Sequence, residues 1–194
     1  MLMFFLFILG SSCRTYPLAT PLSFASFHCS PVFIIPACDY RNPIERVYLK
    51  EYAQGMNSIL EVTVVFKDED QPFFFFDAVY DLYRRFRFHR KKDIETFYIH
   101  TGDAYKRVES IDFGDAYSRG QHFHKGFVTH YHEVVSRDKM EMKGERPVIY
   151  INTWNHLFSE KDTNPSLNKT FYTEYAIFDG NRASAEPHSC FKSR

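Results

Sequence analysis

The chain has 194 residues, enough for one domain to bury a hydrophobic core without disulfides or a structural metal. Its 24 lysine and arginine residues balance its 24 aspartate and glutamate residues, which argues against a global field that attracts nucleic acid or an anionic membrane. Aromatic residues make up 18% of the sequence, and since Phe and Tyr suit half-buried pleated surfaces, the composition favours a β-rich fold.

The first 40 residues differ in composition from the rest of the chain. Leu2 to Leu9 form an apolar run like a short signal-peptide core, and only Arg14 and Asp39 are charged in the whole segment. The run is far shorter than the roughly 20 residues of a membrane-spanning helix, so no transmembrane span is expected. We expect residues 1–40 to be a leader, a poorly ordered arm or a mis-called start, and residues 41–194 to form a single β-rich globular domain. A leader implies a secreted or exported protein, and its absence implies a cytoplasmic one.

The cysteines do not decide between these compartments. They lack the C-x-x-C spacing of zinc knuckles and thioredoxin-like sites. Two disulfides in an oxidising compartment and four free thiols in a reducing one fit the sequence equally well. The four are Cys13, Cys29, Cys38 and Cys190.

Short alternating segments predict strands along most of the domain. The segment from Ile59 to Lys67 is rich in β-branched residues and ends at a charged turn, which is typical of a strand. Four further segments, separated by turns rich in Gly, Asp or Lys, predict an antiparallel meander, and a fifth predicts a last strand that ends at the turn signal Asp179–Gly180. These are residues 95–102, 104–114, 126–135, 146–158 and 173–178.

One segment has helical spacing. Between Phe76 and Phe86 the aromatic residues recur every three or four positions, with Asp77 near the start and arginines near the end, where each charge suits the helix dipole. A short helical turn is expected within residues 181–190. The predicted fold class is α+β and β-rich: a mostly antiparallel curled sheet or sandwich of five to seven strands with one main helix.

The stretch HFHKGFVTHYHE, His122–Glu133, contains four of the nine histidines in two His-x-His pairs. Within each pair, at 122–124 and 130–132, strand alternation puts both imidazoles on one face. A two-residue turn at Lys125–Gly126 keeps the pairs on opposite faces, whereas an odd-numbered loop or a bulge brings them together. Loop length therefore decides whether the pairs meet.

The segment VIYINTWNH predicts a two-faced strand. Ile149 and Ile151 form one face, and polar and aromatic residues form the other. Rings and hydrogen-bonding groups on one face are typical of a surface that binds a small ligand. The predicted ligand-binding residues are Tyr98, His100, Asn152 and Trp154, and the favoured function is a small ligand-binding or interaction domain.

A second hypothesis is a metal-dependent hydrolase or lyase. A His-x-His pair with a third histidine can hold zinc or another divalent transition metal and leave a position open for water, which predicts His130, His132 and His156 as ligands. The simpler alternative is that these histidines occupy half-buried strand positions without a chemical role, so the sequence favours a binding domain over an enzyme.

A third hypothesis concerns the basic run RRFRFHRKK. Cations interleaved with Phe86 and Phe88 are typical of some polyanion-binding surfaces, although a solvated helix end has the same composition. The absence of G-x-G-x-x-G, G-x-x-x-x-G-K-[ST] and G-x-S-x-G argues against nucleotide-binding α/β folds and serine hydrolases, so a small ligand or a protein is the expected partner. The polyanion-binding residues would be Arg84, Arg85, Arg87, Arg90, Lys91 and Lys92.

Overall fold

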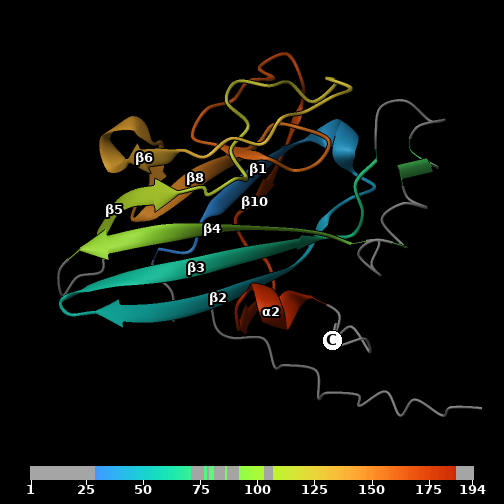
Figure 1. The fold of residues 1–194 in the computed structure, drawn as a ribbon. Coiled ribbons are helices and arrows are strands. Elements are labelled where there is room, and N and C mark those ends of the chain that lie inside the picture. The colour runs from blue at the N-terminus through green and yellow to red at the C-terminus, as the bar shows by residue number, and fades with distance from the viewer. Residues whose placement is uncertain are drawn as a thin grey trace, which may run out of the picture.

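The computed structural model describes residues 29–70, 92–102 and 107–186, together with residues 77, 79, 80 and 86. The described strands form two mixed sheets that pack against each other around a shared core (Figure 1). The apolar run near the N-terminus lies outside the described residues, and so does most of the predicted helix, of which Asp77, Val79, Tyr80 and Phe86 are described and helical.

The larger sheet has six strands in the order β11-β2-β3-β4-β5-β6. Successive strands from β2 to β6 are antiparallel, and β11 is parallel to β2 at one edge. Gly55 makes the turn between β2 and β3 with a φ of 65°, a conformation that costs glycine little. The bounds are β2 (Ile44–Gln54), β3 (Asn57–Phe66), β4 (Asp93–Gly102), β5 (Arg107–Asp112), β6 (Val134–Ser136) and β11 (Ile177–Asp179).

The smaller sheet has five strands, with β1 and β8 parallel to each other at its centre. β10 pairs with β1, and the short strands β7 and β9 both pair with β8, all three antiparallel. The bounds are β1 (Val32–Pro36), β7 (Met142–Lys143), β8 (Arg146–Ile151), β9 (Phe158–Ser159) and β10 (Lys169–Tyr172).

β1 lies in the segment that the charge distribution had grouped with an N-terminal arm. All five of its residues are buried, and it is bonded to strands on both sides. Residues 29–40 are therefore part of the packed domain, which begins earlier than the expected boundary at residue 41. The segment contains few charged residues because its strand lies in the core, and core strands of a mixed sheet carry few charges.

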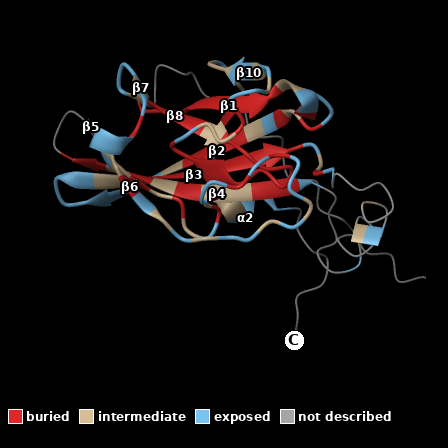
Figure 2. Cartoon of the chain, turned by 90° about the horizontal axis from the view of Figure 1, so that it is seen from above, coloured by how far each residue is buried: buried red, intermediate tan, exposed pale blue. Residues whose placement is uncertain are grey.

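The core lies between the two sheets, where strand alternation directs one side chain in two inward (Figure 2). Phe97 of β4 contacts Phe33 of β1 and Phe158 of β9, with ring centroids 6.3 and 5.0 Å apart, so the aromatic rings join both sheets. On β4 the inward face carries Phe97 and Ile99, which are fully buried. Asp93 and Glu95 fall on the same inward face.

The predicted β-rich class is confirmed, and the strand expected at 59–67 is β3. The sheets are mixed, because β1 pairs with β8 and β11 with β2 in parallel. The expected strand at 126–135 is mostly loop: only an isolated bridge at Tyr131 and the start of β6 are extended.

The helical turn expected after residue 180 is α2 (Arg182–Ala185), which a capping box at Asn181 begins. α2 lies on the face of the larger sheet that points away from the smaller one (Figure 1), where Ala185 packs on Tyr48, Val65, Ile94 and Phe178. Two 3-10 turns, η2 (Ala37–Asp39) and η3 (Arg137–Lys139), follow β1 and β6. In the part of the chain that is described, no helix has the length and apolarity needed to cross a membrane.

Candidate functional site

The site begins at the turn that follows β8. The chain reverses there: the Asn152 amide donates to the Leu157 carbonyl at 3.1 Å, and the His156 amide donates to the Thr153 carbonyl at 3.0 Å. The Thr153 hydroxyl also accepts from the Leu157 amide at 2.9 Å. Strand alternation therefore ends at Ile151, and the residues after it do not form the predicted second face of β8.

His156 lies at the centre of the molecule, fully buried, with a left-handed φ of 58° that is unusual for a residue other than glycine. Its ring stacks on Phe66 with centroids 3.8 Å apart and planes 5° from parallel. Nδ1 lies 2.8 Å from Oδ2 of Asp93, and Nε2 lies 3.0 Å from Oδ2 of Asp39. We call these three residues the buried triad.

The His156 ring of the buried triad is positively charged inside the protein. Burial alone lowers the pKa of His156, but hydrogen bonds to Asp39 and Asp93 outweigh burial and raise this pKa to about 10. At neutral pH the ring is an imidazolium, and each ring N–H donates to one carboxylate. Asn42 Nδ2 donates to the other oxygen of Asp39 at 2.9 Å. The triad therefore links η2, the start of β4 and the β8–β9 turn.

A cavity of about 420 Å3 lies beside the first half of β4. β5 pairs with β4 only from Tyr98 onward, and after Asp112 the chain leaves the sheet through Gly114, so no described strand pairs with that edge of β4 before Tyr98. We call this space the β4 cavity. Its lining residues come from β4, the following loops and α2: Glu95, Thr96, Tyr98, Gly114, Asp115, His130 and Arg182.

Glu95 is the distinctive group of the β4 cavity. Its side chain is half-buried, and none of the described residues donates a hydrogen bond to its carboxyl. Burial and the nearby charge of Asp93 raise the pKa of Glu95 well above its usual value, while Arg182 acts in the opposite direction. Glu95 therefore keeps its proton at pH values where an ordinary glutamate is ionised.

His130 lines the β4 cavity together with Glu95 and has a defined tautomer. Nδ1 lies 3.1 Å from the Asp115 carbonyl oxygen, which can only accept, so Nδ1 carries the proton. Nε2 lies 3.3 Å from Asn155 Nδ2 and accepts from it. Asn155 precedes His156 in the chain and accepts from the Thr153 hydroxyl at 2.8 Å. The β4 cavity is thereby connected to the turn that carries the buried triad.

The four predicted ligand-binding residues do not share one surface. Tyr98 and His100 lie on the face of β4 opposite Phe97, and Tyr98 alone lines the β4 cavity. Asn152 is buried and donates to the Lys161 carbonyl at 2.7 Å, and Trp154 is buried and donates to the Lys125 carbonyl at 2.9 Å. Both side chains therefore donate hydrogen bonds that hold loops against the smaller sheet.

The three predicted metal ligands make separate contacts. His132 is exposed and pairs with Asp112 at 3.0 Å, while both ring nitrogens of His156 face carboxylates. His130 lies in the β4 cavity. Within the described ranges, no group of three or more His, Cys, Asp or Glu residues is placed to hold a metal ion.

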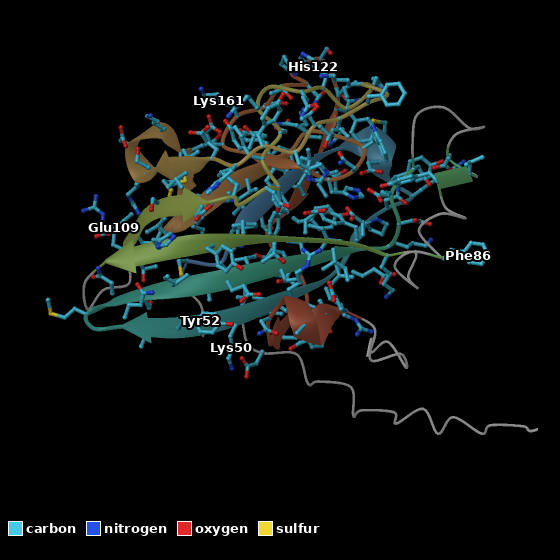
Figure 3. The ribbon with its side chains drawn as sticks, viewed as in Figure 1. Lys50, Tyr52, Phe86, Glu109, His122 and Lys161 are labelled. Carbon is cyan, nitrogen blue, oxygen red and sulfur yellow. The ribbon has the colours of Figure 1, made fainter. Side chains whose placement is uncertain are left out.

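The two His-x-His pairs reach different parts of the chain. His122 Nδ1 contacts the Thr163 carbonyl, whereas His130 contacts Asp115. Figure 3 shows His122 on the loops at one side of the molecule, with Tyr52 of β2 at the opposite side. The loop between the pairs is a series of turns, so the hairpin on which the parity argument depended does not form.

Most of the basic run lies outside the described residues. Lys92 is described and exposed, and its Nζ lies 2.5 Å from Oε2 of Glu45. Polyanion binding through Arg84, Arg85, Arg87, Arg90, Lys91 and Lys92 stays a prediction.

Sequence reasoning missed the acidic members of the site. A signal for two of them was present: in DIETFYI, Asp93 and Glu95 alternate in phase with Phe97 and Ile99, which places carboxyls on the inward face of a strand. Buried carboxyls are uncommon unless they are paired, so that phase indicates a polar site at the core. No such local signal exists for Asp39 or Arg182, which only the fold brings to the site.

No family model, no curated protein and no solved structure matches the chain.

Proposed function

We propose that the protein binds a small polar ligand in the β4 cavity. The observation that carries this proposal is Glu95, a half-buried carboxyl with a raised pKa and no hydrogen-bond donor among the described residues. Ionisable groups whose pKa is shifted by burial and by neighbouring charges, and which lie in a cavity, are concentrated at functional sites. A ligand donor or acceptor would satisfy the Glu95 carboxyl.

The size and chemistry of the β4 cavity support the same proposal. A volume of about 420 Å3 lies in the range of small-molecule sites. Its lining offers a cation, carboxyls, an imidazole and two hydroxyls, and Asp115 and His130 are exposed, so solvent reaches it. Hydrogen bonds hold the wall of the cavity in place: Asp93 accepts from His156, and Asn155, the residue before His156, donates to His130. A binding site needs rigid support of this kind.

Acid–base catalysis is a second candidate, favoured by the tautomer of His130. Glu95 is suited to donate a proton. The Nδ1 proton of His130 is held by the Asp115 carbonyl, so Nε2 is the nitrogen that would accept a proton, in exchange for its hydrogen bond from Asn155. Pairs of groups that are protonated differently at one pH are the usual basis of such chemistry. Binding is the first step of either function.

The test is an NMR screen of small polar compounds against the 15N-labelled full chain, including amines, carboxylates, sugars and uncharged alcohols. We expect at least one class to shift the amide resonances of Thr96, Asp115 and His130 together, and the Glu95→Gln variant to weaken that binding. If no compound shifts these resonances, the β4 cavity is not a ligand site.

Catalysis needs a separate measurement. Chromogenic nitrophenyl esters and glycosides would be assayed with the wild type, Glu95→Gln and His130→Gln. A catalytic role requires both variants to lose about 100-fold or more of the rate, with the acidic limb of the pH profile absent from His130→Gln. Equal rates in all three proteins would remove the second candidate.

A further inference from the structure

Among the residues that the structure describes, the charges around the β4 cavity do not balance. Three carboxyls act on Glu95: Asp93 on its own strand, Glu69 after β3, and Asp115 in the loop that follows β5. Arg182 of α2 is the cation among the lining residues, and its Nε already lies 3.3 Å from Oε1 of Glu186. Leaving Glu69 aside, the described lining residues therefore set the carboxylate of Asp115 against an Arg182 that already has an acidic partner, so this part of the wall is negative before Glu95 ionises.

The buried triad does not offset this charge. The imidazolium of His156 is shared between Asp39 and Asp93, so the three residues together carry one net negative charge at neutral pH. His130 adds no compensation, because its contacts to the Asp115 carbonyl and to Asn155 fit the neutral ring. The surplus negative charge therefore remains at the wall of the cavity.

We infer that the ligand of the β4 cavity carries a protonated aliphatic amine, which pairs with the carboxylates of Asp115 and Glu95. The inference rests on the proposed function and names the chemical class of its ligand. Asp115 is exposed at the mouth and Glu95 is half-buried deeper in the wall, so an ammonium group that enters from solvent meets both. The Tyr98 ring and the Thr96 hydroxyl provide contact for the rest of the molecule.

An organic cation fits better than a metal ion. Among the described residues no three metal-binding side chains converge, and a space of about 420 Å3 is far larger than one ion requires. An ammonium group needs only two or three acceptors and a contact surface for its carbon chain, both of which line the β4 cavity.

Binding moves one proton. The amine enters as R–NH3+ and keeps its protons, the Glu95 carboxylic acid releases its O–H proton to solvent, and the resulting carboxylate forms the ion pair. The groups that face Glu95 during this step are Asp93, Glu69, Asp115, Tyr98, His130 and Arg182. Affinity therefore rises with pH until Glu95 is ionised in the free protein, and it is flat above that point.

The experiment compares 1,4-diaminobutane with 1,4-butanediol, which has the same length and no charge. The full chain, labelled with 13C at glutamate carboxyls, is titrated from pH 4 to 9 with and without each compound. We expect the diamine to lower the pKa of Glu95 by a unit or more and to bind roughly tenfold more tightly per pH unit below that pKa, with no effect of the diol.

Variants and a metal control separate the explanations. Asp115→Asn alters an exposed side chain and should weaken diamine binding about tenfold, whereas the control Glu109→Gln, at the other end of β4 beside Gly102 (Figure 3), should leave it unchanged. If calcium chloride lowers the Glu95 pKa in place of the diamine, or if the diol binds equally well, the inference is overturned. If the screen finds acids or sugars in the cavity, only this inference fails; if it finds nothing, the proposed function fails as well.

Discussion

His156 is a fully buried residue whose ring contacts two carboxylates. Its backbone is left-handed, a conformation that costs a non-glycine residue about 1 kcal/mol or more, and its ring has been removed from water. Two hydrogen bonds to carboxylates and the stacked ring of Phe66 compensate for the strained backbone and for the loss of water around the ring. A residue held in this way makes the stability of the fold depend on pH.

The pH dependence has a definite sign. The pKa of His156 rises from 6.5 in the unfolded chain to about 10 in the fold, so the stabilisation is complete below pH 6.5 and is lost as pH rises to about 10. We expect the free energy of unfolding of the wild type to fall over this window. His156→Gln should be less stable by a few kcal/mol at pH 6 and should lose the part of this decline that comes from the buried triad, so its curve should be less steep than that of the wild type. Urea unfolding at a series of pH values measures both effects.

His132→Gln is the matched control. His132 also contacts a carboxylate, that of Asp112, but it is 66% exposed, so its ion pair is screened by water. Its replacement should change the unfolding free energy by less than about 0.5 kcal/mol. A parallel decline of the His156→Gln and wild-type curves between pH 6.5 and 10 would show that the triad is not charged.

Glu95 makes stability depend on pH in the same direction as His156, because its folded pKa is also raised. The pKa of Glu95 in the fold lies well above the ordinary 4.5. Its contribution to the free energy of unfolding is therefore fully present below pH 4.5 and is lost as pH rises through the folded pKa. Glu95→Gln does not ionise and avoids this loss. We expect its melting temperature to exceed that of the wild type by a few degrees at pH 8, with no difference at pH 4. A melting temperature below that of the wild type at pH 8 would mean that ionised Glu95 has a partner in the fold.

At the scale of elements, the loop between β5 and β6 supplies Asp115 and His130 to the β4 cavity. Gln121 holds this loop in shape, since its Nε2 donates to the carbonyls of Ser118 and Thr129 at 2.8 and 2.6 Å, and its Oε1 accepts from the Thr129 amide at 2.7 Å. One buried side chain thus closes the twelve-residue segment from Ser118 to Thr129, which has no regular secondary structure. Loops of this length usually have a functional role.

Gln121→Ala should loosen the loop while leaving both sheets intact. Loss of these hydrogen bonds costs about 1–3 kcal/mol locally. We expect faster hydrogen–deuterium exchange for residues 118–130, unchanged exchange in β3 and β4, and weaker ligand binding in the β4 cavity. Gln54→Ala, at the exposed end of β2, is the control and should not alter exchange in the loop.

Local patterns predicted the elements better than they predicted the site. The β-branched run at 59–67 and the capped turn after residue 180 are confirmed because their signals lie within a few neighbouring residues. The segment after Ile151 was misread, because alternation in VIYINTWNH continues in the sequence while hydrogen bonds to Thr153 and Leu157 turn the chain. Alternation alone does not mark where a strand ends.

At the scale of the whole molecule, the mixed character of the sheets was not predictable. β1 pairs in parallel with β8, and β11 with β2, and in both pairs the strands lie far apart in the chain. Parallel partners need long connections and leave no turn signature between them. The buried triad is subject to the same limit, since Asp39, Asp93 and His156 come from three distant segments.

The central place of β1 leads to a prediction about the whole fold. Phe33 is fully buried between the sheets, where it contacts Phe97 and Tyr175. Phe33→Ala should lower the free energy of unfolding by about 3–5 kcal/mol. Phe171→Ala, on the edge strand β10, removes a ring that is 63% exposed and should cost less than about 1 kcal/mol. Equal stability of the two variants would mean that β1 is not part of the core.

The buried triad has one more consequence, which concerns kinetics. Both ring N–H protons of the His156 imidazolium point at carboxylates and lie out of reach of water, so they exchange only when the interior opens. Such protons give separate low-field proton NMR signals that survive at neutral pH. Asp39 follows β1 of the smaller sheet, and Asp93 begins β4 of the larger one. The rate at which these two protons exchange with water therefore measures how often the two sheets separate.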